Sequence, residues 1–252
     1  RIDMPYMSQL TGKTEQELFE DLKGVIFLNP MHTSEEDGRP KYLPADEYLS
    51  GNVREKLEWA RRSAELYPED YSENVRALEA VQPVDLKASE ISVRLGATWL
   101  PPEIAEQFMF DLFDTPRYCQ WNIHVHFSQY TGEWNVEGKS YDRSNVKAHN
   151  TYGTGRVNGY KIMEETLNLR DVRIFDYIED RSGRKMAVLN KKETAIAQGK
   201  QELIKQAFAD WIWSDPERRE QLTKLYNEKF NSIRPREYDG SHLNFVGINP
   251  EI

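Results

Sequence analysis

The sequence contains one cysteine and no long apolar run. A single cysteine excludes a disulfide within the chain, and such sparse use is typical of a reducing compartment, so we expect a cytoplasmic protein. A helix that spans a bilayer needs about 20 consecutive apolar residues, and no stretch here approaches that length. No apolar stretch follows residues 1–5 either, so we expect neither a secretory signal nor contact with a membrane.

The sequence also lacks the motifs of ATP-driven and methyl-transferring enzymes. It has no Walker A sequence, no Asp-Glu-Ala-Asp or Asp-Glu-x-His box and no Asn-Pro-Pro-Tyr sequence. The glycine-rich stretch 151–156 lacks the Lys-Ser/Thr ending of a phosphate loop, so a tight turn is favoured, which leaves Arg156 at a helix start. Cys119 has no base close in sequence and is expected to be a partly buried thiol at a strand start. We predict no catalytic residue and no cofactor in these 252 residues.

Positive charge is scarce and unevenly distributed. The net charge is −9, and residues 1–90 carry 11 basic and 19 acidic groups. Residues 181–240 carry 13 basic and 9 acidic groups, the only such excess along the chain. Because a surface that binds DNA needs a basic face, this last stretch is where we expect any DNA contact.

Aromatic residues are frequent, at 12%, and indicate packed structure rather than disorder. The hydrophobic periodicity predicts an α+β protein with three parts. Residues 1–87 are expected to be helical and winged-helix-like, 88–190 to form a mainly antiparallel sheet with helices, and 191–252 to form a helical hairpin followed by an extended linker.

The first part has the element order of a winged helix. We expect helices at 4–10 and 14–22, a strand at 25–28, a polar loop at 34–38 and a strand at 41–43. Thr14 and Glu17 form a predicted capping box. The second helix carries Glu15, Glu17, Glu20 and Asp21, which would repel phosphate, so we expect it to pack against protein. Further helices are predicted at 53–67, capped by Asn52, and from Ser72 to about residue 81.

The central and last parts follow from their periodicity and turn residues. Expected helices are 90–95, 102–113, 157–167, 191–213 and 217–231. Expected strands are 121–127, 133–137, 145–150, 172–178 and 185–189. In the helix 191–213 we expect the core side to carry Ile196, Leu203, Ile204, Ala207, Phe208 and Trp211.

Cationic residues of the last part, together with Arg156, are the candidate DNA contacts. Arg234 and Arg236 stand beside Tyr238 and His242 in an extended stretch, a composition suited to backbone contact and base stacking. The alternative is a solvated helix face, because acidic residues are interleaved. The candidates are Arg156, Arg184, Lys185, Lys191, Lys192, Arg218, Arg219, Arg234 and Arg236.

Histidines give one further hypothesis. His124 and His126 stand two residues apart, so both side chains point to one face of the expected strand, where His149 or Glu137 could complete a metal site. The alternative, which we favour, is the polar side of a sheet.

Five stretches resemble a known family: 45–57, 89–99, 189–194, 226–231 and 234–243, with the sequences ADEYLSGNVREKL, SEISVRLGATW, LNKKET, YNEKFN and RPREYDGSHL. They resemble the region that precedes the helicase core in very large proteins of bacterial conjugative elements and phages. Those proteins fuse an adenine-specific DNA methyltransferase to a Swi/Snf-type helicase. The resemblance extends over essentially the whole chain, and no catalytic residue of the family maps onto it.

The resemblance implies an accessory module of a longer protein. Its partners would be the helicase core of the same polypeptide and DNA, while ATP and S-adenosylmethionine would bind only to parts outside this sequence. The alternative from another class is a spacer or protein-docking unit that does not contact DNA, which the acidic second helix favours.

Overall fold

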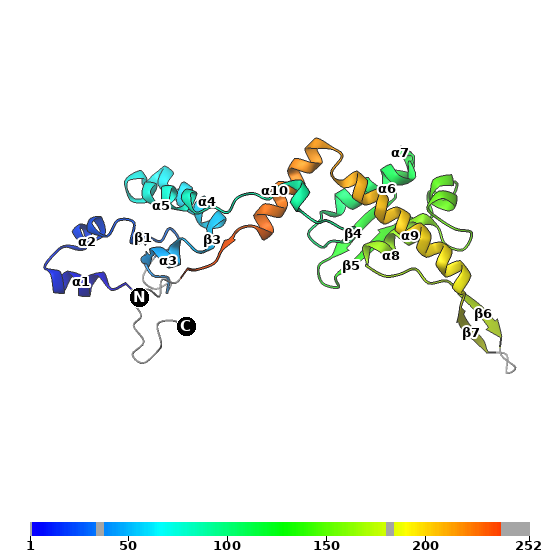
Figure 1. Cartoon of the computed structure of the whole chain (residues 1–252), viewed down its shortest axis with the longest axis horizontal. Coiled ribbons are helices and arrows are strands. Elements are labelled where there is room, and N and C mark those ends of the chain that lie inside the picture. The colour runs from blue at the N-terminus through cyan, green and yellow to red at the C-terminus, as the bar shows by residue number, and fades with distance from the viewer. Residues whose placement is uncertain (1, 34–37, 180–183, 238–252) are drawn as a thin grey trace, which may run out of the picture. The chain divides into compact units, whose positions relative to one another are not determined.

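The computed structural model describes residues 2–33, 38–179 and 184–237. The chain forms two compact units: the N-terminal unit, residues 1–86 with 225–252, and the central unit, residues 87–224 (Figure 1). The central unit has 20 basic and 20 acidic residues, whereas the N-terminal unit has 13 and 22, so the whole net charge of −9 belongs to the latter. The predicted mixture of helices with small antiparallel sheets is confirmed.

The N-terminal unit begins with the predicted order of helices and strands: α1 (Met4–Thr11), α2 (Glu15–Asp21), β1 (Ile26–Leu28) and β2 (Tyr42–Pro44). The predicted capping box is present, because the backbone N–H of Thr14 donates to the Glu17 carboxylate at 2.8 Å and that of Glu17 donates to Thr14 Oγ1. Met4, Leu18 and Ile26 are buried together. The predicted loop at 34–38 lies mostly outside the described residues.

A second core follows in the same unit, formed around α3 (Ala45–Tyr48), α4 (Val53–Leu66) and α5 (Pro68–Ala80). Asn52 caps α4 as predicted, and its side chain accepts from Glu55 N. Ser72 is not a cap: α5 begins at Pro68, because proline at the first helical position needs no N–H partner. The buried members are Phe27, Tyr48, Val53, Leu57, Ala60 and Leu78.

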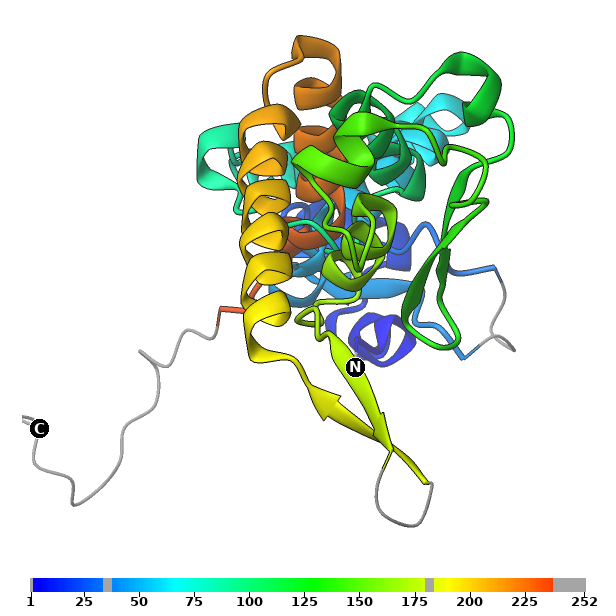
Figure 2. The same cartoon turned by 90° about the vertical axis from the view of Figure 1, so that its right-hand side faces the viewer.

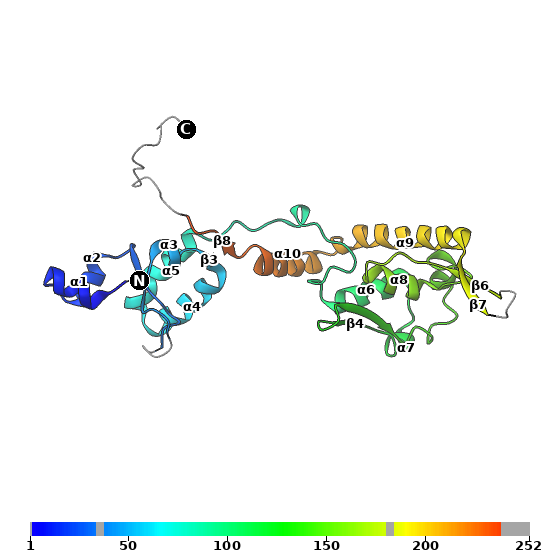
Figure 3. The same ribbon diagram turned by 90° about the horizontal axis from the view of Figure 1, so that it is seen from below.

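The chain returns to this unit at the end of α10 (Pro216–Phe230) and in β8 (Ile233–Arg234), which pairs with β3 (Gly51–Asn52; Figure 3). Asn227 holds Leu86 through both backbone groups: its Oδ1 accepts from Leu86 N, and its Nδ2 donates to Leu86 O, each at 2.9 Å. The extended stretch that the sequence predicts from residue 233 onward is described only as far as residue 237. Tyr238 and His242, which belong to that prediction, lie outside the described residues.

In the central unit the helices predicted at 102–113, 157–167 and 191–213 are present with nearly the predicted bounds. They are α6 (Pro102–Phe113), α8 (Gly159–Leu167) and α9 (Lys191–Ile212). Its sheets are two separate antiparallel ribbons, β4 (His124–Ser128) with β5 (Glu133–Glu137), and β6 (Phe175–Glu179) with β7 (Lys185–Leu189). Side chains from α6, α8 and β4–β5 form its core, including Phe108, Met109, Phe113, Val125, Trp134, Val136, Ile162 and Met163.

The β4–β5 ribbon has helical side chains along both of its edges. Val125 N donates to the Glu106 carboxylate of α6 at 2.8 Å, and Val136 N donates to the Glu164 carboxylate of α8 at 2.9 Å. Asn168 pairs with both backbone groups of Trp134. Because an unpaired strand edge invites association with other chains, these contacts close a ribbon that would otherwise be exposed at both edges.

Two predicted elements of the central unit are wrong. Residues 90–95 form no helix beyond a short turn (Ala88–Glu90), and Ile91 is already extended, at φ −96° and ψ 113°. Gly96 follows at φ +89°, where an added Cβ would lie 2.2 Å from Leu167 O. Residues 145–150 form no strand: Asn145 Oδ1 accepts from Ala148 N and starts the helical turn Lys147–Thr151.

Cys119 and its surroundings also differ from the prediction. Cys119 is buried in α7 (Arg117–Gln120), not at a strand start. Trp121, expected at the start of a strand over 121–127, lies outside it and is 82% exposed, because the strand begins only at His124.

The face of α9 that packs against the core differs from the predicted face. Ile196 and Leu203 are 43% and 51% exposed, whereas Ile204 and Phe208 are buried as expected. Ala207 and Trp211 are partly buried. Polar residues at Thr194 and Gln201 take buried positions, because they bind the backbone of a neighbouring segment, as described next.

Candidate nucleic-acid interface

Residues 170–174 run along α9 and are fixed to it by polar side chains. Val172 N donates to Gln201 Oε1 at 3.2 Å, and Gln201 Nε2 donates to Arg170 O at 2.7 Å. Ile174 N donates to Thr194 Oγ1 at 3.0 Å. Val172 and Ile174 are therefore buried, and the alternate residue Arg173 is exposed.

The turn that leads into this segment has an uncommon backbone conformation. Leu169, just after α8, has φ +57° and is 56% exposed. The N–H of Arg170 donates to Glu165 O at 2.9 Å and that of Leu169 to Thr166 O, which is the hydrogen-bond pattern of a helix end normally occupied by glycine. The turn places Arg170 at the surface between two hollows.

Two adjoining grooves flank this turn. One, of about 350 Å³, lies between the start of the central unit and α9, and includes Arg94 and Lys205. The other, of about 700 Å³, includes Arg156, Lys161 and Arg173. Leu169, Arg170 and Asp171 line both. Their lining contains six cationic residues and two acidic ones, Glu165 and Asp171. Four of the cations, Arg156, Lys161, Arg170 and Lys205, form ion pairs with acidic residues, and Arg94 and Arg173 do not.

The six cations differ in how far they are already paired. Arg170 contacts Glu133 at 2.5 Å, and Lys161 contacts Glu164 and Glu165. Within the part of the chain that the structure describes, the guanidinium groups of Arg94 and Arg173 have neither an ion pair nor a hydrogen bond. These two groups are therefore available to an anion without breaking an existing contact.

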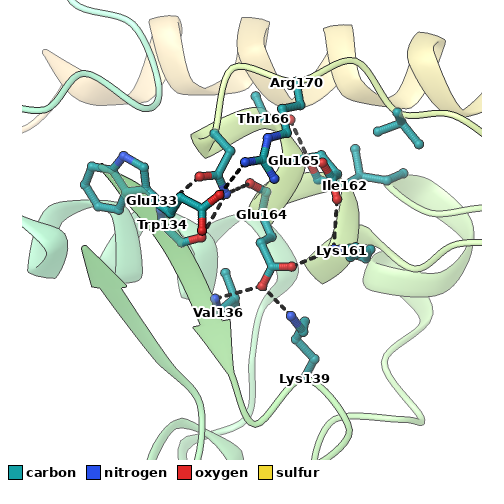
Figure 4. A network of polar contacts seen from close by, with 12 residues as sticks. Glu133, Trp134, Val136, Lys139, Lys161, Ile162, Glu164, Glu165, Thr166 and Arg170 are labelled. Atoms are coloured by element: carbon teal, nitrogen blue, oxygen red, sulfur yellow. Dashed lines mark hydrogen bonds and ion pairs between the residues drawn. The ribbon is translucent and has the colours of Figure 1, made fainter. Parts of the chain in front are cut away.

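A buried carboxylate supports the side of the grooves formed by α8 (Figure 4). Glu164 accepts from Val136 N at 2.9 Å and from Lys161 Nζ at 2.7 Å, and it contacts Lys139. Burial alone raises the pKa of Glu164, but the hydrogen bonds from Lys139, Lys161 and Val136 outweigh it and leave the pKa below its ordinary value. The carboxylate thus stays charged and holds α8, β5 and Lys161 in place.

Arg156, predicted as a phosphate contact, lies in the second groove but is partly occupied. Its guanidinium donates to Phe175 O at 3.0 Å and contacts Asp176 at 2.8 Å. Stretch 151–156 is a turn that Thr154 stabilises, since its Oγ1 accepts from Arg156 N and Val157 N.

Arg218 has a structural position. It is 7% exposed, and its guanidinium lies 3.5 Å above the Trp211 ring while donating to the carbonyl oxygens of Trp211 and Ile212 at the end of α9. The guanidinium is thus occupied within the chain, and a contact of Arg218 with DNA stays a prediction that would need these contacts to break.

Arg234, in β8, and Arg236, two residues later, attach this part of the chain to α3 and to Leu49, the residue that follows α3. Arg236 Nε donates to the Asp46 carboxylate at 2.8 Å, and Arg234 Nη1 donates to Leu49 O at 3.3 Å. The hydrogen bond from Arg236 is the largest cause that holds the pKa of Asp46 below its ordinary value. Both arginines therefore already have partners within the N-terminal unit.

The other predicted cations are exposed. Arg184 and Lys185 lie at the start of β7, Lys191 and Lys192 in the first turn of α9, and Arg219 on α10. Their contact with DNA stays a prediction. The first four lie in one stretch, residues 184–192, that includes β7 and the start of α9. The β6–β7 ribbon projects beyond the start of α9 (Figure 2).

The histidine hypothesis finds no support. His124 and His126 lie on one face with ring centroids 6.1 Å apart, next to Glu106 and Glu137 respectively. In residues 2–33, 38–179 and 184–237, no three His, Cys, Asp or Glu side chains gather in a way that could hold a metal ion. None of the helices described there is long and apolar enough to cross a membrane.

Most of the groove cations were not predicted from the sequence. They come from separate places in the chain, and five of the six lie in a stretch, residues 91–180, whose net charge is −4. Only the folding of 170–174 against α9 brings Arg94, Lys161, Arg170, Arg173 and Lys205 to adjoining hollows.

Comparisons with known proteins give two family matches. Residues 94–232 match a family described as "Domain of unknown function (DUF8437)", and residues 1–36 match one described as "Probable helicase, winged helix domain". No curated protein and no solved structure matches the chain. The N-terminal match confirms a helicase-associated region with a winged helix, as the order of α1, α2 and β1 predicted.

Proposed function

Since the chain belongs to the family of domain of unknown function DUF8437 and begins with a helicase-associated winged helix, we propose that it is a non-catalytic accessory module that positions a helicase motor and contacts DNA. The observation that carries the DNA contact is the pair of adjoining grooves lined by six cationic residues, two of which, Arg94 and Arg173, have no ion pair in the described part of the chain. Phosphate contacts of this kind bring a protein onto DNA without reading its sequence.

The finer assignment rests on the sequence resemblance. In this proposal the motor is the Swi/Snf-type helicase of a bacterial mobile-element protein that also has a DNA methyltransferase. ATP and S-adenosylmethionine would bind to those parts, and this chain would hydrolyse no ATP and transfer no methyl group.

The charge of the winged helix supports different contacts for the two units, with protein for the N-terminal unit and DNA for the central unit. Glu15, Glu17, Glu20 and Asp21 make α2 acidic, and Lys13 and Lys23 each pair with one of them. An acidic recognition helix would repel the DNA backbone, so α2 is suited to contact the basic surface of a protein. This observation also favours the second candidate, a spacer that docks proteins and does not bind DNA.

Binding of the chain to single-stranded, duplex and forked DNA across a salt series tests the proposal. We expect micromolar binding at about 50 mM salt that weakens steeply as salt rises. Absence of binding at low salt would remove the DNA contact and leave the spacer.

A further inference from the structure

The β6–β7 ribbon exposes apolar side chains on both of its faces. All residues of β7 are exposed, and in β6 only Asp176 is partly covered. A two-stranded ribbon without a core is only marginally stable in water, and clustered exposed apolar residues mark contact sites more often than solvated surface. The large exposed residues are Phe175, Tyr177, Ile178, Met186, Val188 and Leu189.

The register of the ribbon separates these residues into two different faces. Tyr177 pairs with Ala187, and Phe175 pairs with Leu189, so their side chains share one face. Ile178 and Met186 pair on the opposite face. The first face has the aromatic residues and the second has aliphatic ones.

The aromatic face continues into the second groove. Arg173 is exposed between the buried Val172 and Ile174, and Phe175 and Tyr177 follow at the same two-residue spacing. Since alternate residues of an extended chain point to the same side, Arg173, Phe175 and Tyr177 form one strip. We call these three residues the aromatic strip.

The rings of the aromatic strip are open to a ligand. Phe175 is 41% and Tyr177 74% exposed. Within the described residues neither ring contacts another aromatic ring, and Ala187 opposite Tyr177 is too small to cover it. Lys185 lies on the same face, opposite Glu179, and Lys191 and Lys192 follow just after β7, so cations outnumber acidic residues around the strip.

We propose that the aromatic strip binds single-stranded DNA, with Phe175 and Tyr177 stacking on bases and Arg173 contacting the phosphate backbone. This inference rests on the proposed DNA contact and adds to it a binding site and a preference for unpaired strands. Bases stacked in a duplex offer no free ring face, whereas unpaired bases stack readily on exposed aromatic side chains.

The spacing of the strip supports the same choice. Side chains two residues apart in a strand are separated by about 7 Å, whereas successive bases of one strand in a duplex are only about 3.4 Å apart. Consecutive bases can meet both rings only when the strand is pulled out of the stacked duplex geometry. The basic surroundings favour a polyanion over the apolar surface of a protein.

The test compares affinities of the full chain for fluorescently labelled 20-nucleotide oligothymidylate and for a 20-base-pair duplex. We expect Y177A and F175A each to weaken single-strand binding by about 5-fold to 150-fold, with less than a twofold change for the duplex. Y177F should keep the affinity, because the ring remains. I178A is the matched control: it removes an exposed apolar side chain of the same strand from the opposite face.

A second measurement does not depend on substitutions. An oligothymidylate containing 5-bromodeoxyuridine, irradiated on the unmodified chain, should crosslink to the peptide that contains Phe175 and Tyr177. Binding by the unmodified chain together with unchanged affinity of Y177A and F175A, or an equal loss in I178A, would overturn the strip while leaving the proposed function intact. No binding of any DNA by the unmodified chain would overturn both, and the ribbon would then be a surface for protein contact.

Discussion

Asn168 satisfies both backbone groups of Trp134 with one side-chain amide. Its Oδ1 accepts from Trp134 N at 2.9 Å, and its Nδ2 donates to Trp134 O at 2.8 Å. Glu164, one helical turn earlier, accepts from Val136 N, two residues further along β5. A helix rises about 6 Å over four residues and a strand about 7 Å over two, so side chains at this helical spacing match the free N–H groups of a strand edge.

Replacing Asn168 tests how much this edge contributes. N168A leaves the N–H and the C=O of a buried strand residue without partners, and each such group costs about 1–3 kcal/mol. We expect the free energy of unfolding to fall by about 2–4 kcal/mol in urea titrations. N135A, in the exposed position next to Trp134, should change stability by less than about 0.5 kcal/mol. Equal stabilities of the two variants would show that water replaces the amide without loss.

Glu164 should make the stability depend on acid pH. Burial raises the pKa of its carboxyl, the hydrogen bonds from Lys139, Lys161 and Val136 more than reverse this, and the folded-state pKa lies below the ordinary value of about 4.3. A depressed folded-state pKa contributes stability above the unfolded-state pKa, and this contribution is lost as pH falls through the folded-state value.

E164Q is the variant that isolates this effect. At pH 7 it should lower the free energy of unfolding by about 1–3 kcal/mol, because two charge-assisted hydrogen bonds weaken. Urea titrations between pH 7 and pH 3 should show the difference between E164Q and the unmodified chain shrinking below about pH 4. A difference that is constant over this range would indicate that the charge of Glu164 does not contribute.

Arg218 and Trp211 together end α9, and the kind of cation should matter. The planar guanidinium lies 3.5 Å above the indole ring and donates to the carbonyl oxygens of Trp211 and Ile212. Lysine has no planar fork and cannot stack in this way, so R218K should lower the thermal midpoint, with a loss of about 1–3 kcal/mol. R219K, at an exposed position of α10 next to Arg218, is the control and should leave the thermal midpoint unchanged.

Trp211 itself gives a further test of this contact. W211A should lower the free energy of unfolding by about 2–4 kcal/mol, because the half-buried ring also contacts Phe108.

The helix starts that could be predicted from the sequence are those capped by side chains of residues nearby in the chain. The Thr14–Glu17 capping box and the Asn52 cap each satisfy helix-end N–H groups with neighbours in the chain, so the pattern alone identified them. Strands at 172–178 and 185–189 were predicted as well, and β6 and β7 pair as an antiparallel ribbon, although β6 begins only at Phe175.

Long-range contacts explain what the sequence did not predict. The face of α9 is fixed by Thr194 and Gln201, polar residues that hydrophobic periodicity assigns to the surface, because their partners lie about 20–30 residues away in the chain. The close approach of Gly96 to Leu167 O also joins residues about 70 positions apart and arises only on folding. The grooves are likewise products of these contacts and could not be found from charge counts along the chain.

The same close approach makes Gly96 a sensitive position. In G96A the new Cβ would lie 2.2 Å from Leu167 O, in a backbone conformation that alanine seldom adopts. The backbone oxygen cannot move without displacing the end of α8, so we expect a loss of about 2–4 kcal/mol. G132A shares a positive φ but meets nothing within 4 Å, and it should cost only about 1 kcal/mol. Similar losses in the two variants would mean that backbone conformation, not the contact with Leu167, accounts for the glycine.

The grooves make a separate prediction about salt dependence. Arg94 and Arg173 lie in different grooves and have no ion pair in the described part of the chain, so R94A/R173A removes two charges without freeing an acidic partner. Each lost phosphate contact lowers the slope of log affinity against log salt by about 0.9 on duplex DNA. We therefore expect the slope for duplex DNA to become shallower by about 1.5–2, with a loss that is the same for different DNA sequences. R117A/R143A removes two exposed cations of the same unit outside both grooves and should leave the slope unchanged. If both double variants make the salt dependence shallower by the same amount, DNA is attracted by the cations of the whole unit. The residues of the grooves would then not form a distinct binding site.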